Sequence, residues 1–98
     1  MARDELKALR TRAHALNPTI VIGEAGVSDG LLDELDRQLA ASELVKVRFS
    51  SKDRKERKEQ QTQVLGGSEA QLVLAIGKIA TVFRTGDARR EANQAPAE

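Results

Sequence analysis

Three glycines between a short apolar run and a leucine-periodic segment are the residues whose types and spacing best suit binding chemistry. They are Gly23, Gly26 and Gly30, in the stretch TIVIGEAGVSDGLLDEL from Thr19 to Leu35. Glycine permits positive φ and close approach of a foreign backbone, and a helix that begins just downstream presents unpaired N–H groups to anions. The stretch therefore predicts either a strand-to-helix turn that uses glycine for geometry alone, or a cradle for a sugar-phosphate backbone.

Charge is segregated along the chain, although the net charge is only +1. The segment from Ser28 to Glu43 has five acids and one base, a net charge of −4, and the segment from Leu44 to Leu65 has seven bases and three acids, a net charge of +4. Such polarity suits a polyanion on one side of the molecule, although two ordinary solvated helices would give the same count. Five of the bases are clustered in one polar segment: Lys52, Arg54, Lys55, Arg57 and Lys58.

Residues that could support catalysis or metal binding are sparse. The chain has no cysteine and a single histidine, His14, so neither a thiolate nor a multi-histidine metal site can be built. The serines lie in no nucleophile motif, and no phosphate-loop lysine motif occurs. The only aromatic residues, Phe49 and Phe83, lie at strand positions that look like core, which excludes an aromatic platform for single strands. We therefore expect a protein that is not an enzyme and uses no cofactor or metal.

Apolar spacing predicts the elements that must position these residues. Helices are expected over Asp4–Leu16, Ser28–Ser42 and Ser51–Leu65, and strands over Thr19–Gly23, Leu44–Ser50, Gln71–Ile76 and Ile79–Arg84. The first strand is fully apolar, as is typical of a strand buried on both faces. The second alternates with a period of two, with Val45, Val47 and Phe49 on one face and Lys46 and Arg48 on the other, which predicts a half-buried strand. Ser28 is expected to cap the second helix. Gly66-Gly67 are expected to end the third helix, and Gly77-Lys78 predict a type II′ hairpin turn.

The resulting order, α-β-α-β-α-β-β, predicts a single compact α/β domain with a four-stranded mixed sheet. Helical connections imply right-handed crossovers and parallel pairing of the first three strands, and the hairpin adds one antiparallel strand. The domain is expected over residues 1–86, and the polar residues 87–98 are expected to form a flexible tail. Apolar runs are far shorter than the roughly 20 residues of a membrane span, and no signal-peptide core is visible. We therefore expect a cytoplasmic protein without a membrane partner.

Four segments together form a pattern that resembles a known family. They are LKALRTRAHALNPTIVIGEAGVSDGLLDELDRQL, SELVKVRFS, KDR and AIGKIATVFR, which span about Leu6 to Arg84. In order, they give a helix with Ala-His, a proline, an apolar strand, GxxG, an acidic helix, Glu-Leu-hydrophobic-Lys-Val and a late Ile-Gly-Lys. This combination resembles the YhbY-like RNA-binding family, which carries the CRM (chloroplast RNA splicing and ribosome maturation) domain.

The resemblance implies a fold similar to the C-terminal domain of bacterial translation initiation factor three, and RNA binding. The family's GxxG loop, compared with the loop by which KH domains contact the nucleic-acid backbone, maps onto Gly23, Glu24, Ala25 and Gly26. Family basic positions are matched by Lys46, Lys78 and Arg84.

Two features depart from the family pattern. Glu24 stands where relatives often have a basic or small polar residue, and KERKEQQTQ lacks the apolar residues that relatives place in the middle of the third helix. The second departure leaves the clustered bases Lys52, Arg54, Lys55, Arg57 and Lys58 free to meet RNA.

Three functional hypotheses follow. The leading one is a monomeric, non-catalytic protein that binds ribosomal RNA in precursors of the large subunit and assists ribosome assembly. The alternative is a protein-interaction module that docks on a ribosomal protein or assembly factor through the acidic helix, Ser28–Ser42. A DNA-binding domain is the third, against which the lack of a helix-turn-helix pattern argues.

Overall fold

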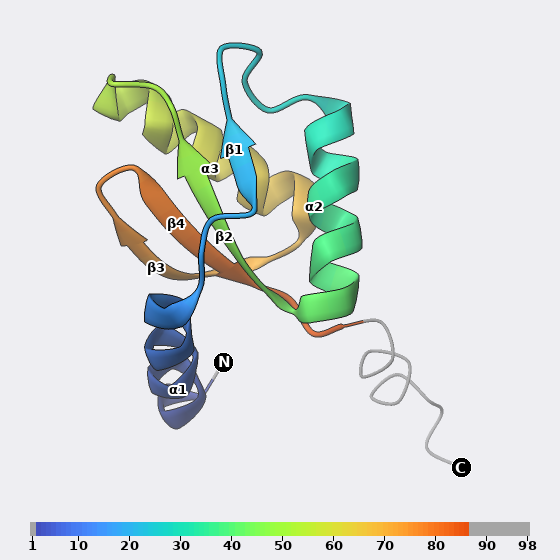
Figure 1. Ribbon diagram of the computed structural model, residues 1–98, viewed down its shortest axis with the longest axis vertical. Helices are drawn as coiled ribbons and strands as arrows, with labels where there is room; N and C mark the ends of the chain where they lie inside the picture. Colours follow the sequence, from blue (N-terminus) through green and yellow to red (C-terminus); the bar gives the residue numbers. More distant parts are fainter. Residues whose placement is uncertain (1, 87–98) are drawn as a thin grey trace.

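The computed structural model describes residues 2–86, which form a four-stranded sheet with helices packed on both of its faces (Figure 1). The expected order of elements is confirmed, and the fold is a compact α/β domain with a mixed sheet. The expected tail, 87–98, lies outside the described residues. The elements are α1 (Arg3–Ala15), β1 (Ile20–Ile22), α2 (Asp29–Ser42), β2 (Leu44–Phe49), α3 (Arg54–Ser68), β3 (Gln71–Ile76) and β4 (Ile79–Phe83).

The strands lie in the order β1-β2-β4-β3, so the expected parallel pairing of the first three strands is wrong for the third. β1 and β2 pair in parallel, whereas β4 pairs antiparallel with both β2 and β3. β3 therefore runs parallel to β1 and β2, as expected, but β4 lies between it and β2. The reason lies in burial. Four of the five residues of β4 are buried, whereas β3 leaves Leu72 37% and Ile76 59% exposed. β4, the more deeply buried strand of the hairpin, takes the interior position, where both of its edges are paired.

β1 is an edge strand, and the expectation that both of its faces are buried is also wrong. Ile20 and Ile22 are buried, but Val21 between them is 57% exposed. α2 and α3 cover one face of the sheet along its length, whereas α1 packs on part of the other face, against β2 and β3. The face of β1 that carries Val21 therefore has no helix over it.

The sheet separates two cores, and β2 contributes to both. Val45, Val47 and Phe49 face α2 and α3, where they pack with residues such as Leu35, as the predicted period of two requires. Leu44 faces the other way and packs with a smaller cluster that includes Leu9 of α1, Val73 and Phe83.

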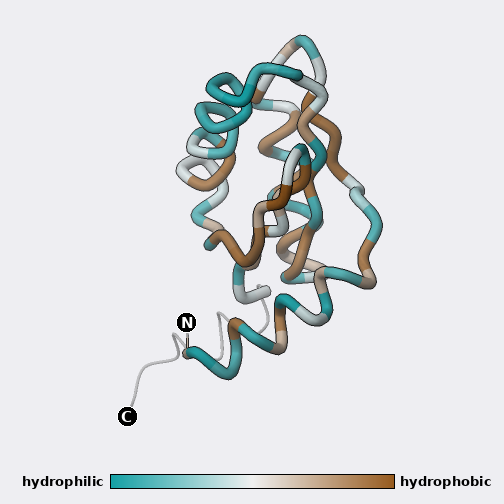
Figure 2. The backbone as a smooth tube through the Cα atoms, turned by 90° about the vertical axis from the view of Figure 1, so that its left-hand side faces the viewer, coloured by the Kyte–Doolittle hydropathy of each residue, from teal (hydrophilic) through white to brown (hydrophobic). Residues whose placement is uncertain are grey.

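α3 continues through Gly66 and Gly67 and ends at Ser68, so the expectation that the glycines end this helix is wrong. The left-handed residue that follows the helix is Glu69, with a φ of 59°. Gly67 instead lets α3 approach α2, because a Cβ there would lie 2.8 Å from Leu32 Cδ1. Figure 2 shows that α3 begins as a hydrophilic helix and carries its hydrophobic residues near its end.

The two neighbouring glycines of α3 differ in surroundings, which predicts opposite tolerance to alanine. Gly66→Ala should raise the free energy of unfolding by up to about 1 kcal/mol, because alanine is the better helix former and nothing lies within 4 Å of its Cβ. Gly67→Ala should gain less or lose stability, because Leu32 must move. Urea unfolding of the two variants measures this difference, and equal stabilities would contradict the close α2–α3 contact.

Candidate functional site

One end of the sheet brings together three segments that are far apart in the sequence. β2 ends there, and the Ser50 N–H donates to the Ile22 carbonyl at 2.9 Å while the Phe49 N–H donates to the Lys78 carbonyl at 2.8 Å. These bonds tie the end of β1 and the hairpin turn to the segment that leads into α3. The glycine loop, the start of α3 and the hairpin turn therefore lie at the same end of the molecule (Figure 1).

The glycine loop contains one glycine that the turn requires and one that it does not. The Gly26 N–H donates to the Gly23 carbonyl at 3.0 Å, and Gly26 has a φ of 71°. Other residues adopt that φ only with strain. Gly23 does not have positive φ, and nothing lies within 4 Å of the position where its Cβ would be. The bare backbone at Gly23 therefore has no explanation within the described fold and is open to approach from outside.

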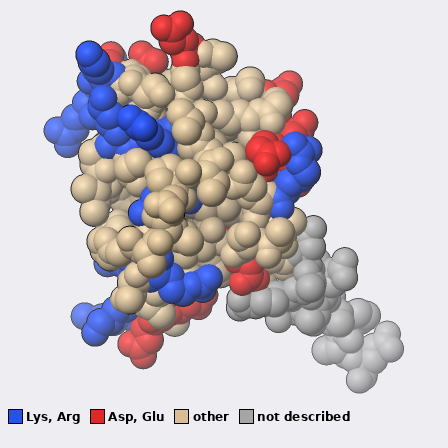
Figure 3. Space-filling model, in the orientation of Figure 1, with Lys and Arg blue, Asp and Glu red and all other residues tan. Residues whose placement is uncertain are grey.

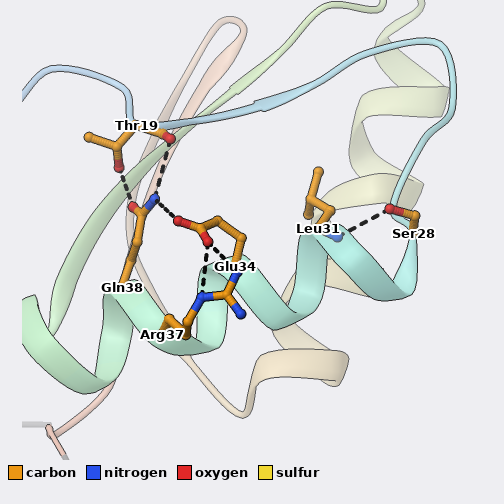
Figure 4. A network of polar contacts seen from close by, with 6 residues as sticks. All are labelled: Thr19, Ser28, Leu31, Glu34, Arg37 and Gln38. Atoms are coloured by element: carbon orange, nitrogen blue, oxygen red, sulfur yellow. Dashed lines mark hydrogen bonds and ion pairs between the residues drawn. The ribbon is translucent and has the colours of Figure 1, made fainter.

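The N-terminus of α2 is partly occupied by its own residues. Ser28 caps the helix as predicted, since its Oγ accepts the Leu31 N–H at 3.1 Å (Figure 4). Asp29 adds a negative charge in the first turn, and the exposed Glu24 adds another in the loop. An anion near the glycine loop therefore needs cations from other elements.

Those cations come from α3, which borders a hollow of about 460 Å³ against the hairpin. We call this space the α3–hairpin hollow; it is lined by Phe49, Arg54, Arg57, Lys58, Gln61, Ala75, Gly77 and Ile79. Lys and Arg side chains gather over the region where α3 begins (Figure 3). The loop lies beside the same helix, because a Cβ at Gly26 would be 4.0 Å from Gln60 Nε2.

The hollow brings together three of the predicted bases, Arg54, Arg57 and Lys58, and Lys78 follows the lining residue Gly77 in the hairpin turn. The turn has the geometry that the sequence predicts: Gly77 has a φ of 58°, and Lys78 does not have positive φ. Lys52 and Lys55 are exposed close to the start of α3 but do not line the hollow.

Two of the predicted bases lie elsewhere. Lys46 is half-buried and lines a smaller hollow of about 190 Å³ together with His14 and Ile76. Arg84 follows β4 at the opposite end of the sheet from the hairpin turn. The structure thus separates both residues from the α3–hairpin hollow.

The position of Arg84 assigns it a structural role in place of the predicted RNA contact. Its side chain is only 9% exposed, and its guanidinium donates to Asp36 Oδ1 at 2.7 Å, to the Asp36 carbonyl at 3.1 Å and to the Ser68 carbonyl at 3.0 Å. Arg84 therefore ties the middle of α2 and the end of α3 to the end of β4, and it does not belong to the candidate site.

Sequence reasoning missed Gln61, Ala75 and Ile79, which also line the hollow. Gln61 could have been predicted, because it lies seven residues after Arg54 and three after Lys58 and therefore on the same face of the helix. Ala75 and Ile79 could not be found in this way, since their position beside α3 depends on the strand order.

Two of the four acids of α2, and Glu43 directly after it, have partners within the fold. Arg37 and Gln38 both donate to the Glu34 carboxylate (Figure 4), and these hydrogen bonds, that of Arg37 first, lower the pKa of Glu34. Asp36 binds Arg84, and Glu43 Oε2 accepts the Gly86 N–H at 2.6 Å. Three of the five acids counted from Ser28 to Glu43 therefore have partners inside the domain.

Neither a metal cluster nor a membrane-spanning helix is found in the described part of the chain. Residues 2–86 contain no group of three or more His, Cys, Asp or Glu that could hold a metal ion. Within the same range, no helix combines the length and apolar character needed to cross a bilayer.

Comparison with known proteins gives consistent matches over most of the chain. The family model described as CRS1 / YhbY (CRM) domain matches residues 1–84. A Pseudomonas aeruginosa protein named as a probable RNA-binding protein is 32% identical over 84 residues, which cover 86% of this chain and 81% of that protein. The probable RNA-binding protein YqeI of Bacillus subtilis is 30% identical over 76 residues, which cover 78% of this chain and 79% of YqeI.

A solved structure supports the fold independently. The solution structure of a Staphylococcus aureus protein superposes with a TM-score of 0.75 and covers 89% of this chain and 91% of its own. At 24% identity, this likeness concerns the arrangement of the elements.

Because Arg84 is buried and hydrogen-bonded, its replacement should lower the stability of the domain, whereas replacement of an exposed base of the same charge should not. Arg84→Met should lower the free energy of unfolding by about 2 kcal/mol, because the hydrogen bonds from a buried charged donor to Asp36 and to the Ser68 carbonyl are lost. Lys78→Met removes the same charge from an exposed turn position and should leave stability within about 0.5 kcal/mol of the wild type. Urea unfolding measures both, and equal effects would contradict the structural role of Arg84.

Proposed function

This chain belongs to the CRS1/YhbY (CRM) domain family, and from this premise we propose that it is a non-catalytic RNA-binding protein of the cytoplasm. Its proposed ligand is ribosomal RNA in precursors of the large subunit, and its proposed role is to assist ribosome assembly. The observation that carries the proposal is the α3–hairpin hollow, where three cations and no acid line a space at the same end of the sheet as the glycine loop. The names of its relatives, which describe RNA-binding proteins, support the same class of ligand.

Charge and shape are the means of binding that this site offers. Arg54, Arg57 and Lys58 lie beside the hollow, and Lys52, Lys55 and Lys78 extend the positive charge along the start of α3 and the hairpin turn. Lys and Arg that neutralise phosphates release counterions, so the affinity should fall steeply as salt increases. The bare backbone at Gly23 offers close approach, while Glu24 keeps the loop from acting as an anion site without these bases.

The alternative proposal, docking on a protein through α2, has less support. It relied on the acidic charge of that helix, yet Glu34, Asp36 and Glu43 already have partners within the domain. A helix whose acids are satisfied internally offers less electrostatic attraction to a basic partner.

The proposed assembly role predicts where the protein is found in cells. In gradients of cell extract at low salt, we expect it to sediment with precursors of the large subunit and to leave them as salt is raised. Complete digestion of RNA should release it. Sedimentation as free protein at every salt concentration would contradict the ribosomal proposal, and association that survives digestion would favour the protein-docking alternative.

The bare backbone at Gly23 predicts a binding defect without a folding defect. Gly23→Ala should weaken binding to a ribosomal RNA fragment by roughly tenfold, which corresponds to one lost charge-assisted contact. Its unfolding free energy should change little, because the added methyl meets nothing within 4 Å. Gly66→Ala is the matched control: its Cβ position is equally open, but it lies near the other end of α3.

Fluorescence anisotropy with a labelled RNA fragment measures both affinities. If Gly23→Ala binds as tightly as the wild type, the glycine loop is a turn beside the site and not a contact.

A further inference from the structure

The α3–hairpin hollow differs from a plain phosphate site because its floor is apolar. Phe49 and Ala75 line this floor on the face of the sheet that α3 covers, and because Phe49 is only 2% exposed, the methyl group of Ala75 is its accessible part. On the α3 side the rim carries Arg54, Arg57 and Lys58, and Gln61 adds one uncharged amide. The hollow thus combines an apolar surface, cationic groups and a donor–acceptor side chain within about 460 Å³.

A base-paired RNA helix makes poor use of such a lining. Its outer surface presents phosphates and sugars, and its bases are stacked and paired inside, so an apolar floor would gain nothing. An unpaired nucleotide presents an apolar base face, polar base edges and a phosphate at once. Those three parts match the floor, the amide and the cations of the hollow.

Arg57 is already held at the rim, because its Nη1 donates to the Ser51 carbonyl at 3.0 Å. A guanidinium that is fixed before binding loses little side-chain entropy on contact, and its planar face can stack on a base. The nearby Arg54 and Lys58 then remain to pair with a phosphate.

From these features, and on the basis of the proposed RNA-binding function, we propose that the α3–hairpin hollow holds a single unpaired nucleotide of the bound RNA. The base lies on the methyl group of Ala75 beside the guanidinium of Arg57, Gln61 contacts a base edge, and Arg54 and Lys58 bind the phosphate. The protein thereby selects RNA with an extruded or looped-out nucleotide over a continuous helix.

Two RNA stems of equal length test this, one fully paired and one with a single unpaired nucleotide, both measured by fluorescence anisotropy. The wild-type protein should bind the stem with the unpaired nucleotide roughly tenfold more tightly, which corresponds to about 1.4 kcal/mol, because only the unpaired nucleotide can reach Ala75, Arg57 and Gln61. Ala75→Leu fills the hollow from an exposed strand position without changing charge, and should remove this preference while leaving affinity for the paired stem within about twofold. Ala41→Leu makes the same change at an exposed position of α2 and should preserve the preference.

Gln61→Ala provides a second variant that removes the amide without filling the hollow, and it should reduce the preference even if Ala75→Leu fails to fold. A wild-type protein that binds both stems equally would overturn the nucleotide site and leave the proposed function standing. No binding to either stem would overturn both. If the preference for the unpaired nucleotide survives both Ala75→Leu and Gln61→Ala, the hollow is not the nucleotide site. The proposal is also overturned if a poly-glutamate peptide binds the hollow in place of RNA.

Discussion

The antiparallel pairing of β2 with β4 is the constraint on which the candidate site depends. It places the hairpin turn beside the end of β2, where the Phe49 N–H bonds the Lys78 carbonyl. On its other edge β2 pairs with β1, which ends at the glycine loop. Three segments separated by dozens of residues therefore meet at one end of the sheet, and α3 begins from the same end.

α3 contributes few apolar side chains to the core of the domain. Only Val64 among its apolar residues is fully buried, and the other buried residues of the helix, Gln60 and Ser68, are polar. The helix is held at its end by other means: Gly67 permits close contact with Leu32, and Arg84 bonds the Ser68 carbonyl. Anchoring at the C-terminal end leaves the charged first turns exposed to solvent and to a ligand.

The sequence predicted the elements well because their signals are local. The period of two in β2, the Ser28 cap and the Gly77-Lys78 turn each depend on a few neighbouring residues, and the structure agrees with them. The strand order and the exposure of Val21 were not predicted, because they depend on which strands take the interior and the edge positions of the sheet. Arg84 was misplaced for a similar reason: its partners, Asp36 and Ser68, lie 48 and 16 residues away. Among the site residues, the bases of α3 could be predicted from charge, whereas the position of Ala75 on the floor of the hollow required the tertiary structure.

The central claim is that the end of the sheet with the glycine loop, the start of α3 and the hairpin turn is the surface that meets RNA. Backbone amide chemical shifts during titration of the isotope-labelled protein with a ribosomal RNA fragment test it residue by residue. The account predicts that the largest changes fall on residues 23–26, 52–61 and 75–79, with little change at the end of α2. Changes concentrated on α1 or along α2, with these three segments unaffected, would contradict it.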